Sequence, residues 1–404
     1  MMRAMSDAVS GLSVHQDWMD VIGNNIANVD TPGFKQSDMN FAAMFSQVLS
    51  TGSRPTATGG GTNPIQVGLG VTVGSTSEDQ SAGALQSTGV PTNLALQGSG
   101  YFVLNGPQGT GYTRVGDFSV DANGNLVEGA TGQKVMGWVA QNGVLPAQNA
   151  ATAQDITLPT NQSQPPSPTT TASFAGNLDL KSTASTQAPI TVYDSLGNTW
   201  NLNVTFSPSG TPDVWNWSAT LPTGAGGTTT GGTVTFNTNG SYASMTGGPV
   251  TLAPTGAATQ SIALNFSAVT QVASPSSVAG AAQNGVPSGQ FTGLSIDNNG
   301  VISGHYSNGL TQTLGQVAVA SVPNPQGLVQ SGDGIYQTGN NSGTPQVGVA
   351  GTGGRGAVAA GYLEGSNVDL AAQFTQMIAA ERGFQANTQV ISTANTMLGT
   401  LVQL

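Results

Sequence analysis

The chain contains few of the residues that carry out catalysis. It has no cysteine and only two histidines, His15 and His305. The lack of cysteine excludes disulfide frameworks, thiolate metal sites and thiol nucleophiles, and the scarcity of histidine removes the commonest general base. His15 falls within an expected helix and His305 within an expected strand, so both are interpreted as structural residues. The residues therefore predict neither an enzyme nor a cofactor site.

One glycine-rich segment has the spacing of a nucleotide-binding loop. Gly351, Gly353 and Gly356 match the spacing G-x-G-x-x-G of a dinucleotide-binding loop. That loop works only between a strand and a helix, because the N-terminus of the helix receives the pyrophosphate. Here Gly361 and Gly365 interrupt the segment that would have to be the helix. In a chain with 57 glycines such a match arises easily by chance, and no nucleotide site is predicted.

Two other clusters have both a chemical and a structural interpretation. The loop DANGN (121–125) could direct oxygen atoms toward calcium, but it lacks the later glutamate of a tight site, and an Asn-Gly turn explains it. Trp200, Trp215 and Trp217 could form a platform on which a carbohydrate stacks. Because Trp215 and Trp217 share one face of a strand, core aromatics of a β sandwich are favoured. No metal site is predicted.

The composition of the chain also argues against nucleic-acid-binding and membrane proteins. The chain has 404 residues, with 8 Lys and Arg, 19 Asp and Glu and a net charge of −11. Such a chain lacks the basic surface that neutralises nucleic-acid phosphates. No run reaches the roughly 18 apolar residues of a membrane helix, and Asp7, His15 and Asp17 interrupt any apolar core of a signal peptide. We expect no nucleic-acid partner, no membrane insertion and no cleaved signal peptide.

The elements that could position functional residues are two terminal helices. Apolar residues recur at alternating steps of three and four near both ends, which is the pattern of a coiled-coil seam. The predicted seam residues, taken as the self-assembly site, are Met5, Val9, Leu12, Met19, Ile22 and Ile26 in the first helix and Leu370, Phe374, Met377, Phe384, Ile391, Leu398 and Val402 in the second. We expect Ser366 to cap the second helix with Asp369 in its first turn. We also expect the helices to pair with each other and with those of neighbouring subunits.

Alternating apolar and polar residues between the helices predict β structure with Gly/Asn turns. The predicted fold class is therefore mixed α and β: long terminal helices in a coiled-coil-like layer, with two nested all-β domains between them. The predicted segments, in order, are the N-terminal helix 1–30, a connecting segment 31–72, a first β domain 73–145 plus 285–358, an inserted outer β domain 146–284, a return linker 359–365 and the C-terminal helix 366–404.

The end of the first helix and the residues just beyond it run NNIANVDTPGFK (24–35), an Asn-rich helix end followed by a Thr-Pro-Gly turn. This segment resembles the N-terminal signature of the bacterial flagellar rod and hook family, and the signature residues are Asn24, Asn25, Ala27, Asn28, Thr31, Pro32, Gly33 and Phe34. Similar matches to the family lie at 94–104, 112–127 and 364–404, in the family's order. The inserted domain and segment 296–322 resemble the hook-type members rather than the shorter rod members.

The resemblance implies a structural, self-assembling subunit. Members of this family are exported unfolded through the flagellar type III apparatus and polymerise outside the cell, and the hook-type members form a curved tube that acts as a flexible joint passing motor torque to the filament. The resemblance implies a homopolymer that also meets the distal rod, the hook cap and the hook-filament junction proteins, in the hook segment of an extracellular flagellum. The alternatives are a distal-rod-like component and, from another class, a surface adhesin or glycan-binding β protein.

Overall fold

The computed structural model describes residues 2–56, 59–159 and 163–402 of the chain. The chain divides into two compact units. Unit 1 comprises the residues up to Leu158, Leu294–Ser303 and the residues from Thr313 onward, and unit 2 comprises Pro159–Gly293 and Gly304–Gln312. Over the described residues, no helix is both long enough and apolar enough to cross a membrane.

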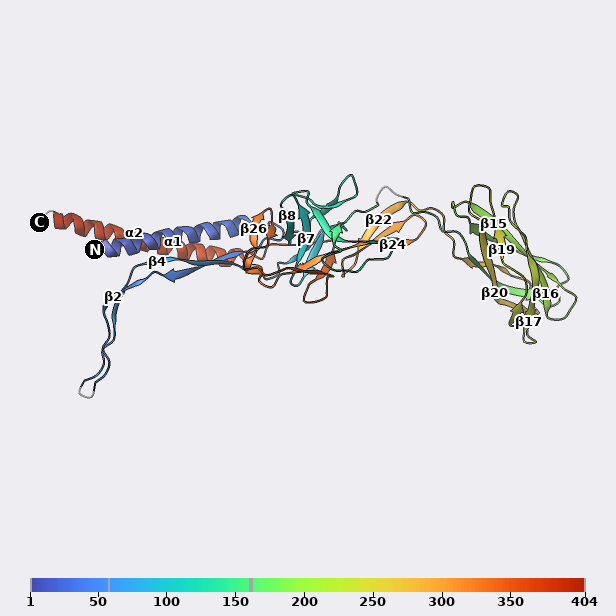
Figure 1. Ribbon diagram of the computed structural model, residues 1–404, viewed down its shortest axis with the longest axis horizontal. Helices are drawn as coiled ribbons and strands as arrows, with labels where there is room; N and C mark the ends of the chain where they lie inside the picture. Colours follow the sequence, from blue (N-terminus) through green and yellow to red (C-terminus); the bar gives the residue numbers. More distant parts are fainter. Residues whose placement is uncertain (1, 57–58, 160–162, 403–404) are drawn as a thin grey trace. The chain divides into compact units, whose positions relative to one another are not determined.

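Both ends of the chain form helices, and these pack against each other in unit 1. They are α1 (Met2–Ala27) and α2 (Leu370–Val402) (Figure 1). The expected cap at Ser366 is wrong, because Asp369 begins α2: its Oδ1 accepts the N–H groups of Ala371 at 2.9 Å and Ala372 at 3.3 Å. A carboxylate at this position satisfies amides that have no partner inside the helix.

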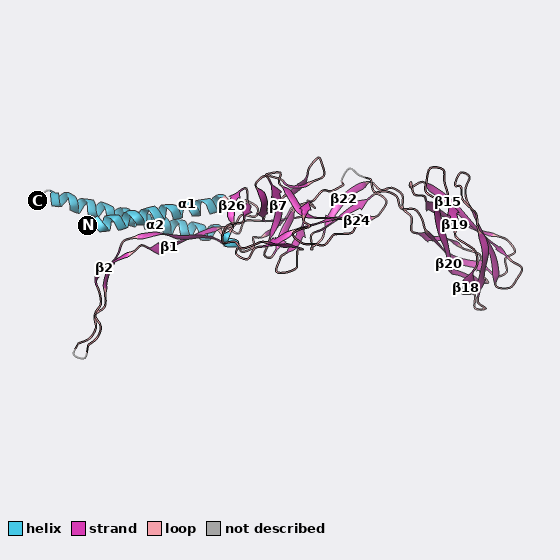
Figure 2. Ribbon diagram, in the orientation of Figure 1, coloured by secondary structure: helices cyan, strands magenta, loops and turns pink. Residues whose placement is uncertain are grey.

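A long β-hairpin follows α1 (Figure 2). Two short strand pairs join the return path of the chain to the start of the β domain. The hairpin consists of β1 (Ser37–Ala43) with β4 (Val71–Glu78) and β2 (Ser46–Ser50) with β3 (Ile65–Gly68). The short pairs are β5 (Leu85–Ser87) with β30 (Tyr362–Glu364) and β6 (Leu94–Gln97) with β29 (Ala357–Ala360).

A mainly antiparallel sheet builds the β domain of unit 1, and three of its strands include residues that belong to unit 2. Its path runs β22 (Phe291–Ile296), β23 (Val301–Tyr306), β24 (Thr311–Val317), β11 (Lys134–Val139), β7 (Tyr101–Gly106), β8 (Gly109–Thr113), β27 (Ile335–Gln337) and β26 (Val329–Gly332). Beside this path lie β9 (Phe118–Val120), β10 (Leu126–Glu128), β12 (Gln154–Asp155), β25 (Val319–Ser321) and β28 (Gln346–Gly348), and the 3-10 turn Pro325–Gly327 precedes β26. Tyr101, Tyr112, Trp138 and Tyr336 form the centre of one buried cluster.

Unit 2 holds two sheets that face a common core. One sheet contains β19 (Val250–Leu252), β20 (Gln260–Val272), β13 (Thr171–Asp179) and β21 (Ala279–Gln283). The other contains β14 (Thr186–Tyr193), β15 (Thr199–Pro208), β16 (Val214–Thr220), β17 (Gly231–Phe236) and β18 (Tyr242–Met245). Buried and exposed residues alternate along β14 and β16, and along β20 with one interruption at Ser267 and Ala268, which explains why these segments form strands with one apolar face.

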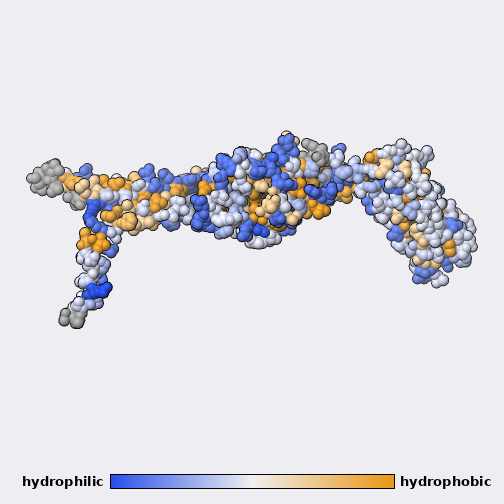
Figure 3. Space-filling model, viewed as in Figure 1, coloured by the Kyte–Doolittle hydropathy of each residue, from blue (hydrophilic) through white to orange (hydrophobic). Residues whose placement is uncertain are grey.

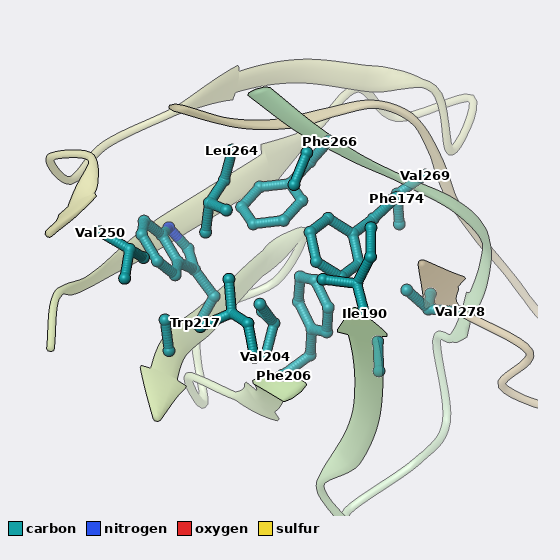
Figure 4. Packing of buried hydrophobic residues seen from close by; sticks show 14 of the residues in the cluster. Phe174, Ile190, Val204, Phe206, Trp217, Val250, Leu264, Phe266, Val269 and Val278 are labelled. Carbon is teal, nitrogen blue, oxygen red and sulfur yellow. The ribbon is translucent and has the colours of Figure 1, made fainter. Parts of the chain in front are cut away.

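The core of unit 2 is centred on the ring of Phe266, as Figure 4 shows. The centroids of Phe174, Phe206 and Trp217 lie 5.4, 5.2 and 5.4 Å from it, within the range of favourable aromatic pairs. Trp215 and Trp217 are each only 2% exposed, so neither offers a face on which a sugar could stack. Together with the packed terminal helices, these sheets confirm the predicted fold class.

A buried aspartate fixes the turn between β14 and β15. Asp194 accepts hydrogen bonds from the backbone of Leu196 and Asn198, both at 2.9 Å, and from the side chains of Asn198 and Trp200, both at 3.0 Å. Burial raises the pKa of this carboxyl, but the donors from Trp200 and Asn198 together outweigh burial and lower it below its ordinary value.

The lowered pKa of Asp194 makes the stability of unit 2 depend on pH. Because its folded pKa lies below the unfolded value of 3.8, its contribution is present above that value and is lost as the pH falls through the folded pKa. We expect Asp194→Asn to lower the free energy of unfolding by about 1–3 kcal/mol at neutral pH and to lose this acid dependence. Urea unfolding between pH 7 and pH 2, followed by tryptophan fluorescence, measures both effects. Equal slopes against pH in the two proteins would contradict the assignment.

Candidate self-assembly site

The contact between α1 and α2 buries mostly small and polar residues, and α1 also buries the apolar Val14 and Ile22. Ala8, Gly11 and Asn25 are buried in α1, and Gln373 and Ala380 are buried in α2. A Cβ at Gly11 would lie 2.7 Å from the side-chain nitrogen of Asn387, and one at Gly383 would overlap the ring of His15. Glycine at these two positions therefore lets the helices approach closely.

The predicted seam residues differ in how far the single subunit buries them. In α1, Ile22 is buried, Met5, Leu12, Met19 and Ile26 are half-buried, and Val9 is exposed. In α2, Met377, Phe384, Ile391 and Leu398 are half-buried, Leu370 and Phe374 are exposed, and Val402 ends the helix. Their role in assembly stays a prediction, because one subunit does not show what would cover them.

One face of α2 is apolar and uncovered in the subunit. Leu370, Phe374 and Ile378 are 40%, 51% and 59% exposed and succeed one another at helical spacing. Figure 3 shows apolar residues along the helices and on part of the hairpin. An apolar stripe on a surface helix normally covers a core, and a contiguous exposed one marks an interaction surface.

The hairpin adds a second uncovered surface. Its inner half is held by α1, since the ring of Phe41 lies 5.4 Å from Trp18 and 5.8 Å from His15. Its outer half, β2 with β3, is exposed almost throughout, and Phe45 is 88% exposed. An isolated two-stranded hairpin is marginally stable in water, so this half is suited to packing on another chain.

The signature residues hold the chain where it leaves α1. Asn25 is 1% exposed, and its side chain donates to the carbonyl of Ser37 at 2.8 Å and to Gln373 Oε1 at 3.1 Å and accepts from the N–H of Ser37 at 2.9 Å. Gly33 has a φ of 71°, and its N–H donates to the carbonyl of Glu364 at 2.7 Å. The motif thus ties the end of α1 to the start of α2.

The remaining signature residues have simpler positions. Asn28 caps the end of α1 through its side chain, which donates to the carbonyl of Asn24 at 3.0 Å and accepts from Thr31 at 3.0 Å. Ala27 and Pro32 are exposed, and Phe34 is half-buried. Asn24, Asn28 and Thr31 through Phe34 line a cleft of about 560 Å³ whose other wall includes Asp117 and Asp333.

A buried ion cluster lies directly beyond the signature. Lys35 Nζ is 2.6 Å from Glu364 Oε1, and Arg114 Nη1 is 3.4 Å from Glu364 Oε2. The three residues are 2%, 3% and 1% exposed. We call these three residues the ionic clasp. Lys35 also donates to the carbonyl of Ser81 at 2.7 Å, and Arg114 to that of Gly98 at 2.8 Å.

The surroundings of the clasp are polar but enclosed. Burial lowers the pKa of Lys35, the hydrogen bond from Lys35 to Glu364 opposing this shift, and burial raises the pKa of Glu78. Burial also raises the pKa of Tyr101 to about 12, and the Arg114 guanidinium lies 5.6 Å from the centroid of that ring. Charges held in such surroundings need their partners, because desolvation makes an unpaired charge costly.

The clasp could not be predicted from the sequence. Lys35 and Glu364 are 329 positions apart, and no pattern within either segment links them. The scarcity of charge was the one available signal, since each charged residue is unusual in this chain. Which of the few charges are buried depends on the fold alone.

The other chemical candidates have structural surroundings. The carboxylate of Asp121 accepts the N–H groups of Asn123 and Asn125, both at 2.8 Å, which makes the loop a hydrogen-bonded turn. Gly356 is followed by β29 and not by a helix, so the glycine motif cannot present a helix N-terminus to a pyrophosphate. In the part of the chain that the structure describes, no three His, Cys, Asp or Glu residues are grouped as metal ligands would be.

Comparisons with known proteins agree with this geometry. Family models match the flagellar basal body rod protein over residues 5–35, the flagellar hook protein FlgE/F/G D1 domain over 95–170, the flagellar basal body protein FlaE D2 domain over 161–286 and the flagellar basal body rod FlgEFG protein C-terminal over 359–404. The flagellar hook protein FlgE of Treponema pallidum is 38% identical over all of both chains. That of Escherichia coli is 34% identical over 99% of this chain and 100% of its own. The crystal structure of Helicobacter pylori flagellar hook protein FlgE2 aligns with a TM-score of 0.51 at 16% identity, covering 69% of this chain and 100% of that one.

Proposed function

Because this chain belongs to the flagellar hook protein FlgE family, we propose that its subunits polymerise through the apolar faces that the single subunit leaves uncovered. The chain is a structural component of the flagellar hook and not an enzyme. The match to the D2 domain over residues 161–286 favours the hook over the shorter rod-like alternative.

The proposal is supported by the difference between the buried and the exposed surfaces of the two helices. The small and polar surface pairs α1 with α2 inside the subunit, while Leu370, Phe374 and Ile378 remain exposed. Identical subunits that join by head-to-tail contacts without closing form a helical tube. The seam residues and the outer hairpin supply the apolar area for those contacts.

We further propose that the polymer is a curved tube that works as a flexible joint. Unit 2 is poor in charge: Asp179, Lys181, Asp194 and Asp213 are the charged residues of segment 159–293. Contacts between neutral polar surfaces exchange weak, water-bridged hydrogen bonds, which allows neighbouring subunits to slide. Fixed ion pairs would favour one register and resist bending.

Adding charge to the outer surface tests the sliding mechanism. Thr191 and Asn201 are exposed partners on β14 and β15, so Thr191→Lys with Asn201→Asp places a Lys-Asp pair on that surface. We expect tubes of this variant to be stiffer in bending than tubes of the uncharged control Thr191→Gln with Asn201→Gln, as measured from thermal shape fluctuations. Equal stiffness in both variants would refute the mechanism.

We also propose which flagellar proteins the polymer contacts and how its subunits are exported. The polymer would meet the distal rod, the hook cap and the hook-filament junction proteins, and its subunits would leave the cell through the flagellar type III apparatus. The supporting observation is the family membership, which assigns the chain to the flagellum. The six predicted segments stay a proposal too, supported at the coarser level by the compact unit built around residues 159–293.

Electron microscopy of the purified chain tests the proposed function. In negative stain at high salt, we expect hollow curved tubes to form from the full chain. The adhesin alternative predicts instead that the chain stays dispersed and binds a glycan array. Dispersed subunits at every salt concentration and protein concentration would reject polymerisation.

A further inference from the structure

We propose that the ionic clasp sets the register of α1 against α2 and so excludes pairings shifted by one heptad. The inference concerns the folded subunit and holds whether or not the subunit polymerises. The residues of α2 that face α1 repeat, so a pairing shifted by one repeat places similar residues along the same contact.

The residues of α2 that face α1 recur every seven positions. They are Gln373, Ala380, Asn387 and Ala394, all small or polar. A shift of α2 by seven residues moves it by about 10.5 Å along its axis and brings an alanine opposite Gly11 in place of Asn387. Such a shift keeps small or polar residues along this contact, but it also brings Gln376 or Val390 against the ring of His15 in place of Gly383. Packing therefore opposes the shift at one position and does not distinguish the registers along the rest of the contact.

The clasp fixes both helices from their connected ends. Lys35 follows α1, Glu364 precedes α2, and the carboxylate of Glu364 is also within 3.4 Å of Arg114 in the β domain. Two further bonds lie beside the clasp: the N–H of Gly33 donates to the carbonyl of Glu364 at 2.7 Å, and the N–H of Gln36 to Asn367 Oδ1 at 2.8 Å.

A shifted pairing would pull this junction apart. Moving α2 by one heptad displaces the segment that carries Glu364 by far more than the length of an ion pair. Lys35 and Arg114 would then remain desolvated without their carboxylate, which is the costly state of a buried ion cluster. Buried polar groups are known to specify register in paired helices, and the clasp provides that selection here.

Disulfide trapping in the monomer tests the proposal. The chain has no native cysteine, so Gly11→Cys with Asn387→Cys reports the observed register. Gly11→Cys with Ala380→Cys or with Ala394→Cys reports the pairings shifted by one heptad. Oxidation is followed at low salt and low protein concentration, and gel mobility identifies intramolecular products.

We expect the intact clasp to give the product of positions 11 and 387 at least tenfold faster than either shifted product. Replacing the clasp by Lys35→Met, Arg114→Leu and Glu364→Leu removes the charges, and the shifted products should then rise at least tenfold. The matched control removes the exposed pair of Lys134 and Asp155 by Lys134→Met and Asp155→Leu, and its products should equal those of the intact chain.

The proposal is overturned if the apolar clasp variant forms only the product of positions 11 and 387 at the original rate. A second variant, Lys35→Met with Glu364→Leu, keeps Arg114 and its bond to Gly98 and should also show shifted products. If both variants lose the folded core around Trp138, measured by fluorescence, the clasp serves the stability of the domain and not the register, which also overturns the proposal.

Discussion

Replacing Glu364 alone by leucine is expected to lower the free energy of unfolding of unit 1 by about 3–5 kcal/mol. The change leaves Lys35 and Arg114 buried without their common carboxylate, and each of these cations is at most 3% exposed. The hydrogen bond from Gly83 N–H to Glu364 Oε1 at 3.0 Å is lost as well. Urea unfolding followed by the fluorescence of Trp138 and by circular dichroism measures the effect.

The control for this prediction is Lys134→Met. Lys134 and Asp155 form an ion pair of 3.2 Å whose side chains are 44% and 27% exposed, and removing such a surface pair costs at most about 1 kcal/mol. If Glu364→Leu and Lys134→Met lower the free energy of unfolding equally, the clasp is not a buried charge cluster in solution.

Phe374→Asp is expected to weaken polymerisation strongly while leaving the subunit folded. Phe374 is 51% exposed in the subunit, so its replacement should change the free energy of unfolding by less than about 0.5 kcal/mol. In the polymer, the variant loses a buried aromatic side chain worth about 1.5–3 kcal/mol and gains a desolvated carboxylate. The critical concentration for tube formation should therefore rise by about tenfold to a hundredfold.

Phe374→Leu is the matched variant, because it keeps an apolar side chain at the same place. It should polymerise at a critical concentration near that of the unchanged chain, measured by sedimentation of tubes at high salt. Normal assembly of Phe374→Asp would show that this face of α2 is not covered in the polymer.

The helices were predictable from sequence, but the surface by which they pair was not. Heptad spacing correctly placed α1 and α2, and alternation placed the strands of both units. The same spacing placed Val9 and Phe374 on the predicted seam, and both are exposed in the single subunit, whereas Gly11 and Ala380 are buried. Apolarity shows that a face needs covering and does not show which chain covers it.

Local signals also explain why turns were easier to predict than the ion cluster. The turn at Asp121 is fixed by hydrogen bonds to residues at most four positions away. The clasp unites Lys35, Arg114 and Glu364, whose meeting depends on the whole course of the chain through the β domain. The cap of α2 lies between these cases: Ser366 and Asp369 both suit a cap, and only the geometry selects Asp369.

Cysteine protection on the exposed face of α2 tests the central claim most directly. Ile378→Cys places a single thiol on that face, since the chain has none of its own. Its rate of maleimide labelling should fall at least tenfold when the subunits form tubes. The same cysteine combined with Phe374→Asp, at the same salt concentration, should stay fully reactive. Equal labelling rates in tubes and in free subunits would contradict the claim that this face is the assembly surface.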